Sequence, residues 1–143
     1  MLADSFLTCP SILRAGTVFN LLKPSPTSSI AVYGLGAVGI GAMLAAKYLG
    51  VQTSAALLLP PPCPYLTSKS TVICVDIVPS RLELALSLGA THTINGRDSD
   101  VAAQIKALTP FNAGSMYGVE ATGSVAVLKS AHDALANRGH LVR

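Results

Sequence analysis

The chain has 143 residues, of which 50% are hydrophobic and 12% are charged, and its formal net charge at pH 7 is +3. A chain of this length can bury one core, so we expect a single domain, and the low charge suits an α/β domain whose strands are buried on both faces. The Lys and Arg residues are dispersed, and aromatic residues are few. This composition excludes nucleic acid from the expected partners.

The N-terminal residues do not resemble a secretory signal, because Asp4 is present and no basic residue precedes Phe6. The apolar run at residues 57–59 is far too short to span a bilayer, so no membrane role is expected. The three cysteines have no Cys-x-x-Cys spacing, which argues against a disulfide framework or a self-contained zinc site. We therefore expect a cytoplasmic protein.

A glycine-rich turn follows the first expected strand. Residues 29–33 are mostly apolar, and they lead into Gly34-x-Gly36-x-x-Gly39 and an alanine-rich helix at about residues 37–49, with Gly50 as its expected cap. In dinucleotide-binding folds the first glycine permits a tight turn, the second leaves room for a pyrophosphate, and the third lets the helix pack on the strand. The N-terminus of that helix directs N–H groups at the phosphates. The segment predicts a dinucleotide site.

The second strand is expected at residues 71–76 and ends in Asp76. A carboxylate here accepts hydrogen bonds from the adenosine ribose and repels a 2′-phosphate, which favours NAD over NADP. An ordinary exposed aspartate at a strand end is the alternative interpretation. The spacing is long, because Gly39 to Asp76 covers 76 − 39 = 37 positions, whereas the fingerprint places the acid about 20 residues on.

The surplus residues fall within residues 51–69, which contain four prolines that cannot join a helix or a central strand. We interpret this segment as a Pro-rich inserted loop between the first helix and the second strand. Val51 has codons that start with GT, and Lys69-Ser70 can encode AG, so we hypothesise a translated intron. Transcript reads that join Gly50 directly to the region of Ser70 would support this hypothesis, and uniform coverage of the segment would contradict it.

The rest of the chain alternates helices and strands. The expected order is a helix at 79–88 closed by Gly89, a strand at 91–95, a helix at about 101–108 capped by Asp98 or Ser99, a strand near 116–121, a helix at about 125–135 ended by Gly139, and a strand barely begun at 140–142. This pattern predicts an α/β fold with a doubly wound parallel sheet of Rossmann type, in the order 3-2-1-4-5 and truncated in strand 5.

Catalytic groups are not evident. The three histidines share no spacing for a metal site or a triad, and we interpret each as structural. Asp98 and Asp100 share one helix N-terminus, where the helix dipole accounts for both carboxylates. No nucleophile motif appears, so neither catalytic nor metal-binding residues are predicted.

Five segments outside the insertion carry a resemblance to a known family: Ala15–Asn20, Val32–Gly39, Val75–Leu82, Leu88–His92 and Val119–Gly123. From about residue 15 onward the chain resembles the coenzyme-binding domain of zinc-type medium-chain alcohol dehydrogenases, especially the aryl or benzyl alcohol dehydrogenase-like branch. The resemblance implies that NAD is the cofactor and that its site is built from Gly34, Gly36, Ala37, Val38, Gly39, Asp76, Ile77, Arg81, Ala121 and Thr122. Ile77 would flank the adenine, Arg81 would lie near the adenosine ribose or phosphate, and Ala121-Thr122 would approach the nicotinamide. A solvated helix residue is the alternative for Arg81.

The resemblance also divides the chain. Residues 1–24 would be the remnant of a segment that links to a missing catalytic domain, and residues 25–143 would form the dinucleotide-binding domain. In the family, a Cys-Gly-x-x-Thr-Gly stretch before this domain supplies a catalytic zinc ligand, whereas residues 9–14 keep only Cys9. A catalytic zinc needs three protein ligands. We therefore do not expect this chain to bind the zinc of the full-length family, and we interpret Cys9 as a plain cysteine.

The leading expectation is the NAD-binding domain of a truncated zinc-type alcohol dehydrogenase homologue, from a family of alcohol and aldehyde oxidoreductases, that is not catalytically competent alone. The alternative is a non-catalytic nucleotide-binding or subunit-interaction module, which forms a homo-oligomer through the exposed edge of strand 5. A methyltransferase is a third interpretation, although the third glycine and the segment Glu120–Gly123 favour a dinucleotide. Competition between NADH and S-adenosylmethionine distinguishes these cofactors.

Overall fold

The computed structural model describes residues 15–24, 28–52 and 71–143. Their elements, in chain order, are η1 (Val18–Leu22), β1 (Ser29–Tyr33), α2 (Ala37–Gln52), β2 (Thr71–Asp76), α3 (Pro79–Leu88), β3 (His92–Asn95), α4 (Val101–Ala107), η3 (Pro110–Asn112), β4 (Ser115–Glu120), α5 (Val125–Asp133) and β5 (Leu135–Val142).

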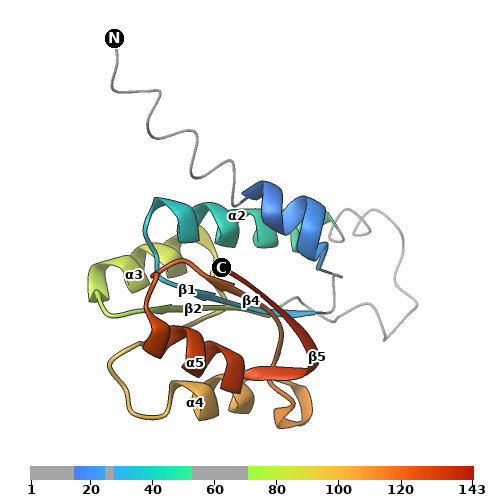
Figure 1. Ribbon diagram of the computed structural model, residues 1–143. Helices are drawn as coiled ribbons and strands as arrows, with labels where there is room; N and C mark the ends of the chain where they lie inside the picture. Colours follow the sequence, from blue (N-terminus) through green and yellow to red (C-terminus); the bar gives the residue numbers. More distant parts are fainter. Residues whose placement is uncertain (1–14, 25–27, 53–70) are drawn as a thin grey trace, which may run out of the picture.

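The strands form one parallel sheet in the order β3-β2-β1-β4-β5. In Figure 1, η1, α2 and α3 lie on one face of this sheet, and α4 and α5 lie on the other. The chain therefore winds outward from β1 in both directions and covers both faces. This arrangement confirms the predicted doubly wound α/β fold and its strand order.

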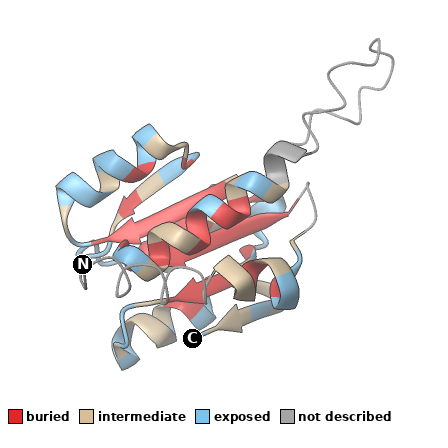
Figure 2. Ribbon diagram, turned by 90° about the horizontal axis from the view of Figure 1, so that it is seen from above, coloured by how far each residue is buried: buried red, intermediate tan, exposed pale blue. Residues whose placement is uncertain are grey.

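The central strands are buried on both faces, which explains why they are apolar along their whole length. In β1, Ile30 and Val32 pack into the core beneath α2 and α3, whereas Ala31 and Tyr33 pack into the core beneath α4 and α5. Figure 2 shows the resulting band of buried residues through the middle of the sheet. Small buried residues, including Ala42 and Ala46, let α2 lie close to the strands.

The strand β2 and the helix α3 begin and end as predicted, and Gly89 closes α3 with φ +103°. The predicted cap at Gly50 is wrong, because α2 continues to Gln52. The first two residues of the predicted inserted loop therefore belong to this helix. The remainder of that loop lies outside the described residues.

The predicted cap of α4 is also displaced. Asp100 occupies the N-cap position, and its side chain makes no cap hydrogen bond to the described residues. Asp98 instead accepts a hydrogen bond from the side-chain amide of Gln104 at 3.1 Å. Thus neither Asp98 nor Ser99 is the cap.

The last two elements differ most from their prediction. α5 ends at Asp133 rather than near Leu135, and β5 spans Leu135–Val142 rather than beginning at His140. Leu135 pairs with Ser115, whose N–H also donates to the Ala134 carbonyl at 2.9 Å, so pairing with β4 ends the helix early. The register shifts between Ser115 and Tyr117, and Arg138 has φ +66°.

Candidate functional site

The glycine turn connects the end of β1 to the start of α2 at the carboxyl edge of the sheet. The strand β1 pairs with β2 on one side and with β4 on the other. The turn therefore lies where the strand order reverses. Open α/β sheets bind ligands at such a point. Gly34 has φ +87°, and its N–H donates to the carbonyl of Val75 at 2.8 Å.

The three glycines of the turn have different surroundings. A Cβ added to Gly39 would lie 1.8 Å from the carbonyl oxygen of Gly34, and one added to Gly34 would lie 2.7 Å from Thr122 Cγ2. A Cβ added to Gly36 would meet no atom of the described residues within 4 Å. Gly34 and Gly39 are thus required by close packing, whereas Gly36 faces a space that the described residues leave open.

Asp76 lies at the end of β2 and is only 6% exposed, so it is not the ordinary exposed aspartate considered as the alternative. Its Oδ2 accepts the N–H of Leu35 at 2.6 Å, and its Oδ1 accepts the N–H of Val78 at 2.9 Å. The carboxylate therefore fixes the glycine turn to the start of α3. A carboxylate has about four lone-pair sites, so further acceptor capacity remains for a hydroxyl group.

Ile77 and Arg81 lie beside Asp76. Ile77 is 53% exposed, so an apolar side chain is accessible next to the buried carboxylate. Arg81 Nη1 lies 3.8 Å from Asp76 Oδ2, and its side chain is half-exposed. The arginine is therefore not merely solvated, although an ion pair this exposed contributes little to stability.

The opposite side of the turn is formed by residues that follow β4. The N–H of Ala121 donates to the carbonyl of Tyr33 at 2.9 Å, and Thr122 lies against Gly34. The predicted site residues thus come together around the carboxyl end of β1, with Asp76, Ile77 and Arg81 on one side and Ala121 and Thr122 on the other.

Sequence reasoning did not select Glu120, although it belongs to this site. Its side chain is fully buried at the end of β4, and its Oε1 accepts hydrogen bonds from the backbone of Thr122 and Gly123. The available signal was the one charged residue of this strand, directly before Ala121-Thr122-Gly123.

Cys74 is a free and buried cysteine of the described residues. Burial raises the pKa of the Cys74 thiol to about 12, so this cysteine is not a nucleophile at neutral pH. Within residues 15–24, 28–52 and 71–143, no three His, Cys, Asp or Glu side chains gather to hold a metal ion. Cys9 and Cys63 lie outside the described residues.

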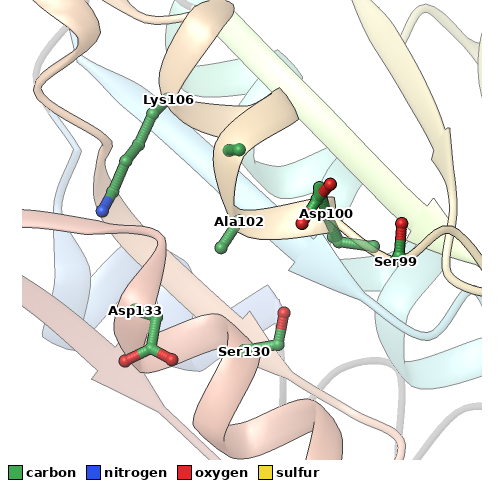
Figure 3. Close-up of a pocket in the computed structure, with 8 residues that line it drawn as sticks. Ser99, Asp100, Ala102, Lys106, Ser130 and Asp133 are labelled. Carbon is green, nitrogen blue, oxygen red and sulfur yellow. The ribbon is translucent and has the colours of Figure 1, made fainter.

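A hollow between α4 and α5 is separate from the glycine turn. Figure 3 shows side chains from both helices along it, and the labelled ones are Ser99, Asp100, Ala102, Lys106, Ser130 and Asp133. None of the predicted site residues lines it.

In the described part of the chain, no helix combines the length and apolar character needed to cross a membrane.

Comparisons with known proteins agree on one family. Residues 68–143 match the family model described as zinc-binding dehydrogenase. Alcohol dehydrogenase 1 of Pisum sativum is 33% identical over 127 residues, which are 89% of this chain and 29% of that protein. Sorbitol dehydrogenase of Bacillus subtilis is 35% identical over 119 residues, which are 83% of this chain and 28% of that protein.

Among solved structures, benzyl alcohol dehydrogenase from Acinetobacter calcoaceticus matches with a TM-score of 0.77 and 41% sequence identity. The match covers 94% of this chain and 32% of that protein. The chain therefore spans less than a third of the length of each of these three proteins.

Proposed function

Because the chain belongs to the zinc-binding dehydrogenase family and has the fold of its coenzyme-binding domain, we propose that it binds NAD(H) at the glycine turn. The observation that carries the proposal is the open space at Gly36, between two glycines that tight packing requires. The relatives are longer proteins that oxidise alcohols or reduce aldehydes. We propose this activity only for a longer protein that contains this domain. A cytoplasmic location belongs to the same proposal.

In the proposed complex, the pyrophosphate lies over Gly36 at the N-terminus of α2. The first turn of this helix, Ala37, Val38 and Gly39, directs its backbone and the positive end of the helix dipole at the phosphates. Asp76 accepts the adenosine ribose hydroxyls through its remaining lone pairs. This contact favours NAD over NADP, because a buried carboxylate repels a 2′-phosphate.

The exposed side chain of Ile77 supplies an apolar surface for the adenine, and Arg81 lies near the ribose or its phosphate. Ala121 and Thr122 occupy the nicotinamide side of the turn. When bound, NAD supplies hydride transfer. The residues of this chain bind and orient the coenzyme. The His, Cys, Asp and Glu side chains of the described residues do not form a site for a catalytic zinc, so no step is assigned to a metal.

The proposal is tested by titrating the chain with NADH and following nicotinamide fluorescence, because the chain contains no tryptophan. We expect saturable binding that Gly36→Ala weakens by about tenfold or more, equivalent to about 1.4 kcal/mol, since the added methyl group enters the phosphate space. Gly16→Ala is the matched control, because its Cβ would make only an ordinary contact, 3.8 Å from Asn20. An unchanged affinity in Gly36→Ala, or no binding by the folded chain, would overturn the proposal.

A second variant examines the choice of coenzyme. Asp76→Asn keeps an oxygen that can accept an amide hydrogen bond but removes the charge, so we expect weaker NADH binding and a smaller preference over NADPH. Asp76→Ala is less informative, because it removes the acceptors of both Leu35 and Val78 and would loosen the turn. S-adenosylmethionine should not compete with NADH.

The edge position of β5 supports a second role, self-association as a subunit-interaction module. An edge strand presents unpaired backbone groups that can pair with another chain. Light scattering over a range of protein concentrations, with and without NADH, tests this role. A monomer under all conditions would contradict it and would leave coenzyme binding unaffected.

A further inference from the structure

The buried carboxylate of Glu120 is the starting point. It terminates β4, pairs with Tyr33 of β1, and has a side chain with 0% exposure. Burying a carboxylate costs free energy unless donors compensate for the lost water. The donors that surround Glu120 therefore show what this residue holds in place.

The donors to Oε1 all come from the turn after β4. The N–H of Thr122 donates at 2.7 Å, the N–H of Gly123 donates at 2.9 Å, and the hydroxyl of Thr122 donates as well. The Thr122 hydroxyl oxygen in turn accepts the N–H of Ser124 at 3.1 Å, at the start of α5. A single carboxylate oxygen thus fixes the path of the chain from β4 to α5.

This turn lies directly against the glycine turn. A Cβ on Gly34 would be 2.7 Å from Thr122 Cγ2 and 3.3 Å from the carbonyl carbon of Ala121. Ala121 is also tied to the end of β1 through the carbonyl of Tyr33. A displacement of the Thr122-Gly123 turn would therefore move the residues that pack against Gly34, on the side of the glycine turn opposite Asp76.

The second oxygen of Glu120 faces a cation. Arg143 Nε lies 3.5 Å from Oε2 in an ion pair, and Oε2 accepts no hydrogen bond from the described residues. Arg143 Nη2 also donates to the carbonyl of Gly123 at 3.1 Å. The arginine therefore compensates the buried charge and contacts the same turn that Glu120 holds.

We propose that Glu120 and Arg143 are positioning residues for the nicotinamide end of the coenzyme. They act through Ala121 and Thr122 and do not touch the coenzyme themselves. The inference rests on the proposed NAD(H) site. It adds that contacts of Arg143, at the end of β5, hold the residues on the nicotinamide side of that site in place.

The test compares NADH with ADP-ribose, which lacks the nicotinamide, by calorimetric titration of the whole chain. Arg143→Met removes the donor to the Gly123 carbonyl, and Glu120→Gln removes the charge from the acceptor of the turn's amides. Each substitution should weaken NADH binding by about tenfold and leave ADP-ribose affinity within about twofold. Arg138→Met is the matched control, because Arg138 is an exposed arginine on the same strand. Equal weakening of both ligands, or of neither, would overturn the inference.

Amide hydrogen exchange gives a second readout that needs no ligand. In Glu120→Gln the amides of Thr122 and Gly123 should exchange faster, whereas the Leu35 amide, which Asp76 holds, should keep its rate. Unchanged exchange at Thr122 and Gly123 would refute the positioning role. Failure of the unmodified chain to bind either ligand would instead refute the proposed function.

Discussion

Gly39 shows how strongly a single residue can constrain this fold. We expect Gly39→Ala to lower the free energy of unfolding by several kcal/mol, because its Cβ would lie 1.8 Å from a backbone oxygen that cannot rotate away. With a typical total stability of about 5–15 kcal/mol, this loss is a large fraction, so the variant should unfold at a much lower urea concentration than the unmodified chain. Urea unfolding followed by circular dichroism measures the change.

The matched control for this experiment is Gly36→Ala. It introduces the same methyl group three positions earlier, where the described residues leave open space, and it should unfold close to the midpoint of the unmodified chain. Equal destabilisation by the two substitutions would contradict the separation between a packing glycine and a ligand-facing glycine.

Cys74 gives the chain a specific sensitivity to high pH. Burial raises the pKa of its thiol from 9.0 to about 12. The unfolded chain therefore loses this proton first, so the contribution to stability is complete below pH 9.0 and disappears as the pH rises through about 12. Between about pH 9 and about pH 11 the free energy of unfolding should fall by about 2 kcal/mol from this group.

Cys74→Ala isolates that contribution. The substitution leaves a cavity whose cost does not depend on pH, and it removes the titrating thiol. The stability difference between the unmodified chain and the variant should therefore shrink as the pH rises. A constant difference across this pH range, measured by urea unfolding, would show that the Cys74 thiol does not titrate as proposed.

At the scale of elements, a side chain of α2 makes a hydrogen bond to the C-terminus of α3. Lys47 of α2 donates to the carbonyl oxygen of Leu88 at 2.7 Å, at the C-terminus of α3 where the helix dipole favours a cation. Lys47→Met should therefore cost about 1–2 kcal/mol. Thermal unfolding measures the loss, and Lys129→Met on the exposed surface of α5 is the control for the change in charge. Equal effects of both substitutions would contradict a specific role.

The elements that could be predicted from the sequence are those whose signals are local. Pro79 begins α3 and Gly89 ends it, and the apolar run before Asp76 forms β2. The end of α5 could not be predicted in this way, because Leu135 suits a helix and is instead paired with Ser115 of β4. Gly50 failed as a cap for a related reason, since a glycine permits the end of a helix without requiring it.

At the scale of the whole molecule, the residues of the candidate site are of two kinds: those with a local sequence signal and those that depend on tertiary contacts. The glycine turn could be predicted from the sequence, because its motif lies within one strand–turn–helix unit. Asp76 could be predicted from its place at the end of the apolar run that forms β2, although its spacing from the turn is longer than the fingerprint expects. The Glu120–Arg143 pair could not, since it depends on β5 lying beside β4 in the folded sheet. The burial of Asp76 likewise depends on how β2 meets the glycine turn.

Coenzyme binding should also stabilise the molecule as a whole. A ligand that binds only the folded state adds about 2.7 kcal/mol to the free energy of unfolding at 100 times its Kd. For a domain of this size that corresponds to a rise in Tm of roughly 5–10 °C. Differential scanning calorimetry with increasing NADH measures the shift, which should grow with the logarithm of ligand concentration.

Gly36→Ala separates this linkage from nonspecific effects of the ligand. Without NADH its Tm should be close to that of the unmodified chain, because the added methyl group meets none of the described atoms within 4 Å. With NADH its Tm should rise far less, because the same methyl group occupies the proposed phosphate space. An equal rise in both proteins would mean that NADH stabilises the fold from another surface, and the glycine turn would lose its assignment as the coenzyme site.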